Sequence, residues 1–167
     1  ALYSSLCDLK PQGSDGFEGF VHALLERLSG SRFFRARSGS QGGKDFGTAG
    51  YGDDYTCVEC KRYARGTSPT TRELLGEISE AGIASSGQLD LWILVTTGAI
   101  GTREAEILRQ AGDRQWQSIE IIDWQDAGLP ELAVLCAAFP EETLTDLQSR
   151  GVTVDLSVVC ADLERVA

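Results

Sequence analysis

The stretch Tyr55-Thr56-Cys57-Val58-Glu59-Cys60-Lys61-Arg62-Tyr63 carries the clearest strand pattern in the chain. Tyr, Thr, Val and Cys are enriched in it, and such residues favour strands. Because side chains alternate between the two faces of a strand, Cys57, Glu59 and Lys61 share one face. We therefore expect a carboxylate and an ammonium group to project from the same face, roughly 7 Å apart along the backbone.

Strand and helix patterns alternate around this stretch. The sequence predicts a helix over 17–28, strands over 33–37, 44–48 and 55–63, a helix that begins at Ser68-Pro69, a strand over 89–96, a helix over 103–111, a strand over 118–123, helices over 130–139 and 141–148, and a last amphipathic helix behind Asp155. This order predicts a three-layer α/β domain with a mixed sheet. The three consecutive strands should form an antiparallel meander, and the strands that follow helices should add in parallel.

Local signals predict where three helices start or stop. Asp15 and Glu18 have the spacing of a capping pair for the first helix, and Gly30 should end that helix. Ser68 at the N-cap with Pro69 at the first helical position should start the helix after the central strand.

Asp45 completes a chemical pattern with Glu59 and Lys61. It lies fourteen residues before Glu59, and a hairpin return would place the two carboxylates side by side. Neighbouring carboxylates repel each other, and a Mg²⁺ ion, which takes a few carboxylate oxygens and keeps several waters, removes that penalty. A metal-bound water can attack phosphorus while a lysine stabilises the developing charge. The pattern therefore predicts metal-dependent hydrolysis of a phosphodiester.

The order Asp45, then Glu59-Cys60-Lys61, resembles the signature of the PD-(D/E)xK nucleases. Gly42-Gly43-Lys44-Asp45 followed by 57–63 is more narrowly similar to the Mrr-type restriction endonuclease domain. Segments 71–74, 94–98 and 121–123 extend this resemblance over about 16–132. Two positions depart from the pattern, because Lys44 replaces the proline of the signature and Glu59 stands where many Mrr-type domains have glutamine.

The resemblance implies a restriction-endonuclease-like α/β/α fold over 1–140, Mg²⁺ as the cofactor with Mn²⁺ as a substitute, and double-stranded DNA as the substrate. It implies Asp45, Glu59 and Lys61 as catalytic residues, with Asp45 and Glu59 as metal ligands. The family also places a glutamate of its first helix near the metal; Glu18 fits by position, although it could equally cap its own helix. Residues 141–167 lie outside the resemblance to this family, and we expect them to form a helical extension that leads into a further domain.

The net charge of −10 is unevenly distributed. The segment 32–72 carries +4, whereas the remainder carries −14, so a basic island sits on an acidic body. Either this island contacts DNA phosphates or it is ordinary solvated surface. The candidate phosphate contacts are Arg35, Arg37, Lys44, Arg62, Arg65 and Arg72. Glu73 and Glu77, on the next predicted helix, could add to the site, but we expect them to be solvated helix charges.

The cysteines and the lengths of the apolar runs indicate the cellular compartment that we expect for the protein. Five scattered cysteines argue against a disulfide framework and for a reducing compartment, so we expect a cytoplasmic protein. No apolar run approaches the ~20 residues that cross a bilayer. We expect the effector domain of a larger defence or restriction protein, as a homo-oligomer or fused to a sensor or NTPase. The alternatives are a catalytically silent nucleic-acid-binding or assembly domain and a structure-selective DNA repair nuclease.

Overall fold

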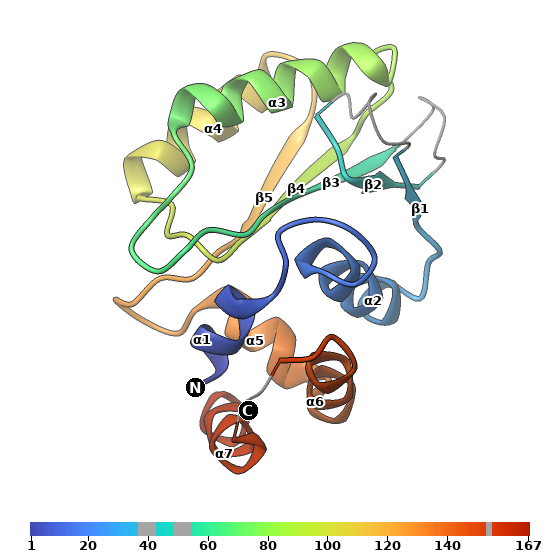
Figure 1. Ribbon diagram of the computed structural model, residues 1–167. Coiled ribbons are helices and arrows are strands. Elements are labelled where there is room, and N and C mark those ends of the chain that lie inside the picture. Colours follow the sequence, from blue (N-terminus) through green and yellow to red (C-terminus); the bar gives the residue numbers. More distant parts are fainter. Residues whose placement is uncertain (37–42, 49–54, 153–154) are drawn as a thin grey trace.

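A computed structural model describes residues 1–36, 43–48, 55–152 and 155–167 (Figure 1). Within these residues the chain is an α/β protein with one mixed sheet in the strand order β1-β2-β3-β4-β5. The strands are β1 (Phe34–Arg35), β2 (Phe46–Gly47), β3 (Thr56–Lys61), β4 (Leu91–Thr96) and β5 (Ser118–Ile122). β1, β2 and β3 pair antiparallel, and β3, β4 and β5 pair parallel. The predicted meander and the parallel additions are both confirmed.

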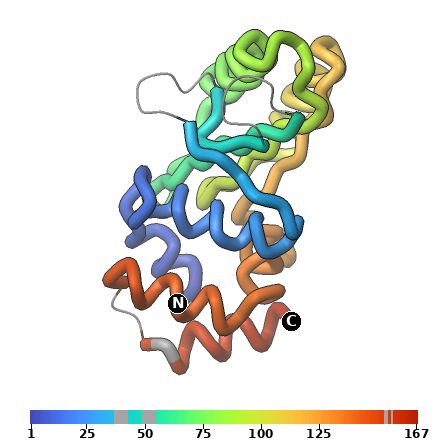
Figure 2. The backbone as a smooth tube through the Cα atoms, turned by 90° about the vertical axis from the view of Figure 1, so that its right-hand side faces the viewer, coloured from blue at the N-terminus to red at the C-terminus, as the bar shows by residue number. Residues whose placement is uncertain are grey.

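Helices cover both faces of the sheet (Figures 1 and 2). They are α1 (Leu2–Asp8), α2 (Phe17–Ser29), α3 (Thr71–Ala84), α4 (Thr102–Asp113), α5 (Glu131–Ala138), α6 (Pro140–Ser149) and α7 (Leu156–Val166). α3 and α4 lie on one face, and α1, α2 and α5 lie on the other, with α6 and α7 beyond them. No helix in the described ranges has the length and apolar character needed to cross a membrane.

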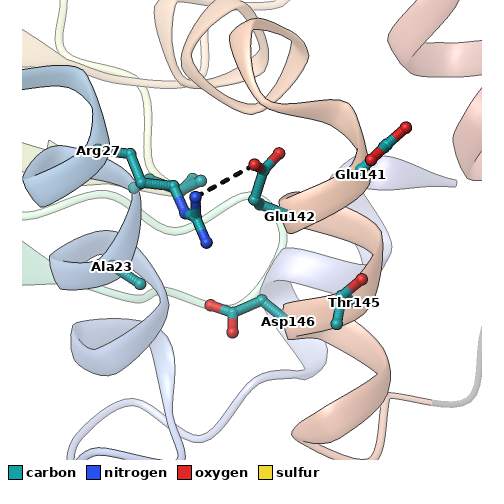
Figure 3. A pocket seen from close by; sticks show the side chains of 7 residues that line it. Ala23, Arg27, Glu141, Glu142, Thr145 and Asp146 are labelled. Carbon is teal, nitrogen blue, oxygen red and sulfur yellow. Dashed lines mark hydrogen bonds and ion pairs between the residues drawn. The ribbon is translucent and has the colours of Figure 1, made fainter.

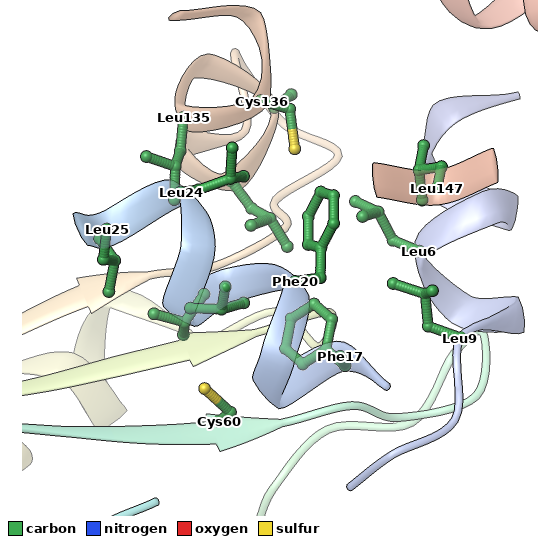
Figure 4. Packing of buried hydrophobic residues seen from close by; sticks show 14 of the residues in the cluster. Leu6, Leu9, Phe17, Phe20, Leu24, Leu25, Cys60, Leu135, Cys136 and Leu147 are labelled. Atoms are coloured by element: carbon green, nitrogen blue, oxygen red, sulfur yellow. The ribbon is translucent and has the colours of Figure 1, made fainter. Parts of the chain in front are cut away.

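The alternation of side chains along β3 divides the interior into two apolar cores. Val58 and Cys60 join the core beneath α2, whereas Cys57 joins the core beneath α3 and α4. In the first core Phe17 and Phe20 of α2 pack against leucines of α1, α5 and α6 (Figure 4). Burial of one such side chain contributes roughly 1.5–3 kcal/mol. The central strand is therefore held from both sides.

The C-terminal extension predicted from residue 141 is helical, as α6 and α7. Leu147 of α6 and Val159 and Leu163 of α7 belong to the same core as α2. The backbone N–H of Leu2 donates to Oδ2 of Asp162 at 3.0 Å, which ties α1 to α7. These two helices thus pack on the domain, and the continuation into a further domain stays a prediction.

The predicted cap of α2 and the predicted start of α3 are wrong, whereas α2 begins at Phe17 as predicted. Asp15 pairs with Lys10, and Glu18 accepts a hydrogen bond from Gly13 N–H at 2.9 Å, so Gly16 is the N-cap of α2. α3 begins at Thr71, where the Thr70 side chain accepts from Glu73 N–H at 3.2 Å. Thr70 and Glu73 have capping-box spacing, a signal that Ser68-Pro69 obscured.

The predicted end of α2 and the predicted cap of α7 are confirmed, whereas other details of the predicted elements differ from the structure. Gly30, with φ +64°, ends α2 as predicted, and Asp155 caps α7. Leu28, although apolar and at helical spacing with the buried Leu24 and Leu25, is 57% exposed near the end of α2. α1 has no counterpart among the predicted helices, because its seven residues are too few for a helical period to stand out. The predicted strand over 33–37 is shorter, and its last residue, Arg37, lies outside the described residues.

Replacing Phe20 with alanine should remove a fully buried ring from the α2 core. We expect Phe20→Ala to lower the free energy of unfolding by about 3–5 kcal/mol, as measured by urea denaturation. Leu28→Ala, on the exposed side of the same helix, is the matched control and should change it by at most about 0.5 kcal/mol. Equal effects of the two changes would contradict this arrangement of α2.

Candidate active site

Glu59 and Lys61 project from the face of β3 that looks toward α3, as the strand period predicted. Glu59 is 4% exposed, and Nζ of Lys61 lies 2.8 Å from its Oε1. A charge pair this deep in the fold is stable only when its members satisfy each other, since charged groups lose solvation on burial. β3 therefore presents a carboxylate and an ammonium that are already in contact.

Asp45 is fixed beside this pair by the hairpin of β2 and β3. Its backbone N–H donates to Val58 O at 2.8 Å, and its side-chain Oδ2 accepts from Cys60 N–H at 2.7 Å. β2 pairs only with Cys57 and Val58, so the backbone N–H of Cys60 has no partner on β2. The Asp45 side chain accepts its hydrogen bond instead. Asp45 thus comes next to Glu59, and the predicted hairpin return is confirmed.

Gly43 anchors the start of this hairpin to α3 and to β4. Its φ is +69°, and its carbonyl accepts from the indole Nε1–H of Trp92 at 3.0 Å. A Cβ built on Gly43 would overlap the carbonyl oxygen of Glu77 and lie 2.8 Å from the backbone nitrogen of Ala81. Only glycine accommodates both the left-handed backbone and this close approach. Asp45 is two residues further on, so the contact sets its position.

Glu18 enters the same site from the first turn of α2. Together with Asp45, Glu59 and Lys61 it lines an open hollow of about 210 Å³, which we call the carboxylate hollow. The other lining residues are Pro11, Gln12, Cys60, Arg62 and Tyr63. The four predicted site residues, far apart in the sequence, are thus brought together in space.

Burial and mutual repulsion shift the acid–base behaviour of the carboxyl groups. Burial, followed by the charge of Glu18, raises the pKa of Asp45 above its usual range. Burial and the charge of Asp45 do the same to the pKa of Glu59. Both groups are thus costly to ionise, because burial removes solvent from each carboxylate and the neighbouring carboxylates repel its charge.

Lys61 remains an ammonium in this setting. Burial alone would lower its pKa, but the carboxylates of Glu59 and Glu77 outweigh burial and raise the pKa well above its usual range. Glu77 Oε1 lies 2.9 Å and Glu73 Oε1 lies 3.4 Å from Nζ of Lys61. Lys61 is therefore a fixed positive charge rather than a proton acceptor.

Glu73 and Glu77 of α3 contact Lys61, so the alternative that they add to the site holds and the expectation of solvated helix charges is wrong. Glu77 has 23% of its side chain exposed, and Tyr63 Oη donates to Glu73 at 3.2 Å. Their spacing of four residues on one helix face was the available signal. It could not show that this face points at Lys61, because that depends on how α3 lies across the sheet.

The carboxylate oxygens of the hollow are ligands that suit a hard divalent cation, although the side chain of Lys61 lines the same hollow. In the portion of the chain that the structure describes, no three His, Cys, Asp or Glu side chains form a ready metal-binding group. Mg²⁺, however, is commonly held by one or two carboxylates, with waters and phosphate oxygens completing its octahedron. Asp45 and Glu59, adjacent and oxygen-donating, meet that smaller requirement.

Two of the basic candidates lie at the exit of β3, beside the carboxylate hollow. Arg62 donates from Nη1 to the carbonyl of Cys7 at 3.0 Å, which ties α1 to the strand. Arg65 is exposed, and its guanidinium carbon lies 5.5 Å from the ring centroid of Tyr3. The sequence could not place α1 there.

The other basic candidates are scattered. Arg72 is exposed in the first turn of α3. Arg35 is half-buried, and its Nη2 would lie 3.0 Å from a Cβ built on Gly19 of α2. Lys44 is only 6% exposed and so is not the surface cation that phosphate contact requires. Arg37 falls outside the described residues.

A separate hollow between α2 and α6 has a structural explanation. Nη1 of Arg27 lies 3.2 Å from Oε1 of Glu142, and this ion pair bridges the two helices across the hollow (Figure 3). On the α6 side Asp146 pairs with Arg150 at 3.3 Å. The first pair joins α2 to α6, and the second lies at the C-terminal end of α6 itself.

We compared the chain with protein-family models, with curated proteins and with solved structures, and none of the three comparisons gave a match. The resemblance to the Mrr-type domain therefore stays a prediction.

Gly43→Ala should destabilise the protein by more than about 2 kcal/mol, because a positive φ alone costs roughly 1–2 kcal/mol and the added Cβ also overlaps α3. Gly87→Ala is the matched control, since Gly87 has φ +74° with nothing within 4 Å of an added Cβ. Its cost should be the backbone strain alone. Thermal unfolding of both variants would show the difference, and equal losses would contradict the packing of Gly43 on α3.

Asp45→Asn should stabilise the metal-free protein at pH 8 by about 1 kcal/mol or more, given that one pKa unit corresponds to 1.36 kcal/mol. The pKa of Asp45 is raised by folding, so its ionisation costs stability as pH rises from the unfolded pKa through the folded one. Asparagine keeps an oxygen for Cys60 N–H and has no charge. The gain should shrink toward pH 4, and a gain independent of pH would contradict the repulsion.

Proposed function

We propose that this chain is a magnesium-dependent endonuclease domain that hydrolyses phosphodiester bonds of double-stranded DNA, with the restriction-endonuclease-like fold of the PD-(D/E)xK class. One observation carries the proposal: Asp45, Glu59 and Lys61, with Glu18, line one hollow in an order and spacing that resemble the Mrr-type domain. The mixed five-stranded sheet with helices on both faces supports it.

Each residue would have a separate task in the reaction. Asp45 and Glu59 would hold Mg²⁺ or, in its place, Mn²⁺. When bound, such an ion lowers the pKa of a coordinated water and neutralises charge on the phosphate. Lys61, kept charged by Glu59 and Glu77, lies where it can stabilise negative charge that develops on the phosphoryl oxygens. Glu18 adds a carboxylate on the opposite wall, able to accept a hydrogen bond from the attacking water.

The setting of the domain remains part of the proposal. The acidic body limits non-specific attraction to DNA, so target choice would lie with a further domain, a partner subunit or a second copy of the chain. This is the arrangement expected of the effector domain of a defence or restriction protein. A structure-selective repair nuclease would use the same residues on a different DNA shape.

The decisive measurement is cleavage of supercoiled plasmid with Mg²⁺ by the parent protein and by Asp45→Ala and Lys61→Ala. Each change should lower the rate at least about a hundredfold, because Asp45→Ala removes a ligand of the proposed Mg²⁺ and Lys61→Ala removes the positive charge proposed to stabilise the phosphoryl oxygens. Lys10→Ala is the control: Lys10 is an exposed lysine paired with Asp15, and its loss should leave the rate unchanged.

The possible outcomes distinguish the proposed nuclease from a catalytically silent domain. Equal cutting by parent and both site variants would mean that the activity is not that of this site. If none of the proteins cuts, calorimetry with Mg²⁺ decides further: binding by the parent that Asp45→Ala abolishes would favour a site awaiting a partner. No binding at all would favour the catalytically silent alternative.

A further inference from the structure

A second hollow, of about 240 Å³, lies beside the carboxylate hollow where the chain leaves β3. We call it the arginine hollow; its lining includes Tyr3, Ser4, Cys7, Asp8, Arg62 and Arg65. Arg62 lines both hollows, so the two share a wall. Ligands of α/β sheets commonly bind beyond the carboxyl ends of the parallel strands, and both hollows lie at that end of β3.

Arg62 has donor capacity that the protein does not use. A guanidinium has five N–H donors in a planar fork, and one of them, on Nη1, is bound to the carbonyl of Cys7. Its Nε is buried and has no hydrogen-bond partner among the described residues. An unpaired buried donor costs free energy. Because Nε is shielded from solvent, an oxyanion in the hollow would be bound by the outer nitrogen atoms of the fork, Nη1 and Nη2. The fork geometry matches the oxygens of a phosphate.

Arg65 supplies the second positive charge. Its guanidinium stacks on the ring of Tyr3, whose centroid lies 4.8 Å from that of Trp124. This stacking holds Arg65 over α1 while its N–H edge remains available for hydrogen bonds. With the carboxylate of Asp8 opposing the two arginines, the arginine hollow still has a net positive charge, although the whole chain carries −10.

We propose that the arginine hollow binds a phosphate of the DNA strand adjacent to the phosphate that is cleaved. This inference rests on the proposed function, since a strand whose scissile phosphate enters the carboxylate hollow must continue past one of its walls. Arg62 forms the wall that leads into a hollow of the opposite charge. The subsite would fix the register of the strand, because phosphate contacts position a protein on nucleic acid without reading its sequence.

The test measures binding of a short DNA duplex over a series of KCl concentrations, without Mg²⁺, so that no cleavage is needed. Arg65→Ala should reduce the slope of log K against log [KCl] by about 0.9, the value for one lost phosphate contact. Arg65→Lys keeps the charge and should restore most of the slope. Arg114→Ala, an exposed arginine at the end of α4, is the control and should leave the slope unchanged.

A second readout locates the phosphate. In ¹H–¹⁵N NMR titrations, a thymidine dinucleotide, which has one internucleotide phosphate, should shift the amide signals of Ser4, Cys7 and Arg65, and the nucleoside thymidine, which has no phosphate, should shift them much less. Equal salt slopes for Arg65→Ala and Arg114→Ala, together with unshifted signals at α1, would overturn the proposal even if the plasmid is cut. Shifted signals in a protein that neither cuts DNA nor binds Mg²⁺ would support the phosphate site and contradict the proposed nuclease activity.

Discussion

The hydrogen bond from Cys60 N–H to the carboxylate of Asp45 holds the candidate site together. It fixes Asp45, which directly precedes the two-residue strand β2, to the strand that carries Glu59 and Lys61. The bond requires the register of the β2–β3 hairpin, in which Phe46 is paired with Val58. It also requires the close contact between Gly43 and the backbone of α3. Hairpin register, glycine packing and carboxylate geometry therefore depend on one another.

Bringing the carboxylates together opposes folding, and the two cores offset that cost. Glu59 and Asp45 are buried near each other and near Glu18, so their ionised forms repel. Lys61 compensates part of the repulsion through its ion pairs with Glu59 and Glu77. The remainder must be supplied by burial elsewhere, including Phe17 and Phe20 on one side of β3 and Trp92 on the other. Sites with this character trade stability for function.

The sequence predicted those parts of the structure that follow from local periodicity. Period two along β3 placed Glu59 and Lys61 on one face, and the spacing to Asp45 predicted the hairpin. The sequence could not predict that Glu77 points at Lys61, because that requires the angle at which α3 crosses the sheet. Nor could it predict the burial of Lys44 or the contact of Arg62 with α1, since both depend on segments that meet only in the folded chain.

The strands that carry the candidate site differ in length and in packing: β3 has six residues, whereas β1 and β2 have two each. β3 has neighbours on both sides and packs into both cores, so its amide protons should exchange with solvent only when the whole domain unfolds. Asp45 precedes a strand of two residues, which is followed outward only by the equally short edge strand β1. The amide protons of β1 and β2 should therefore exchange with solvent before those of β3. Asp45 is thus held at the boundary between the least and the most protected parts of the sheet, whereas Glu59 and Lys61 lie within the most protected strand.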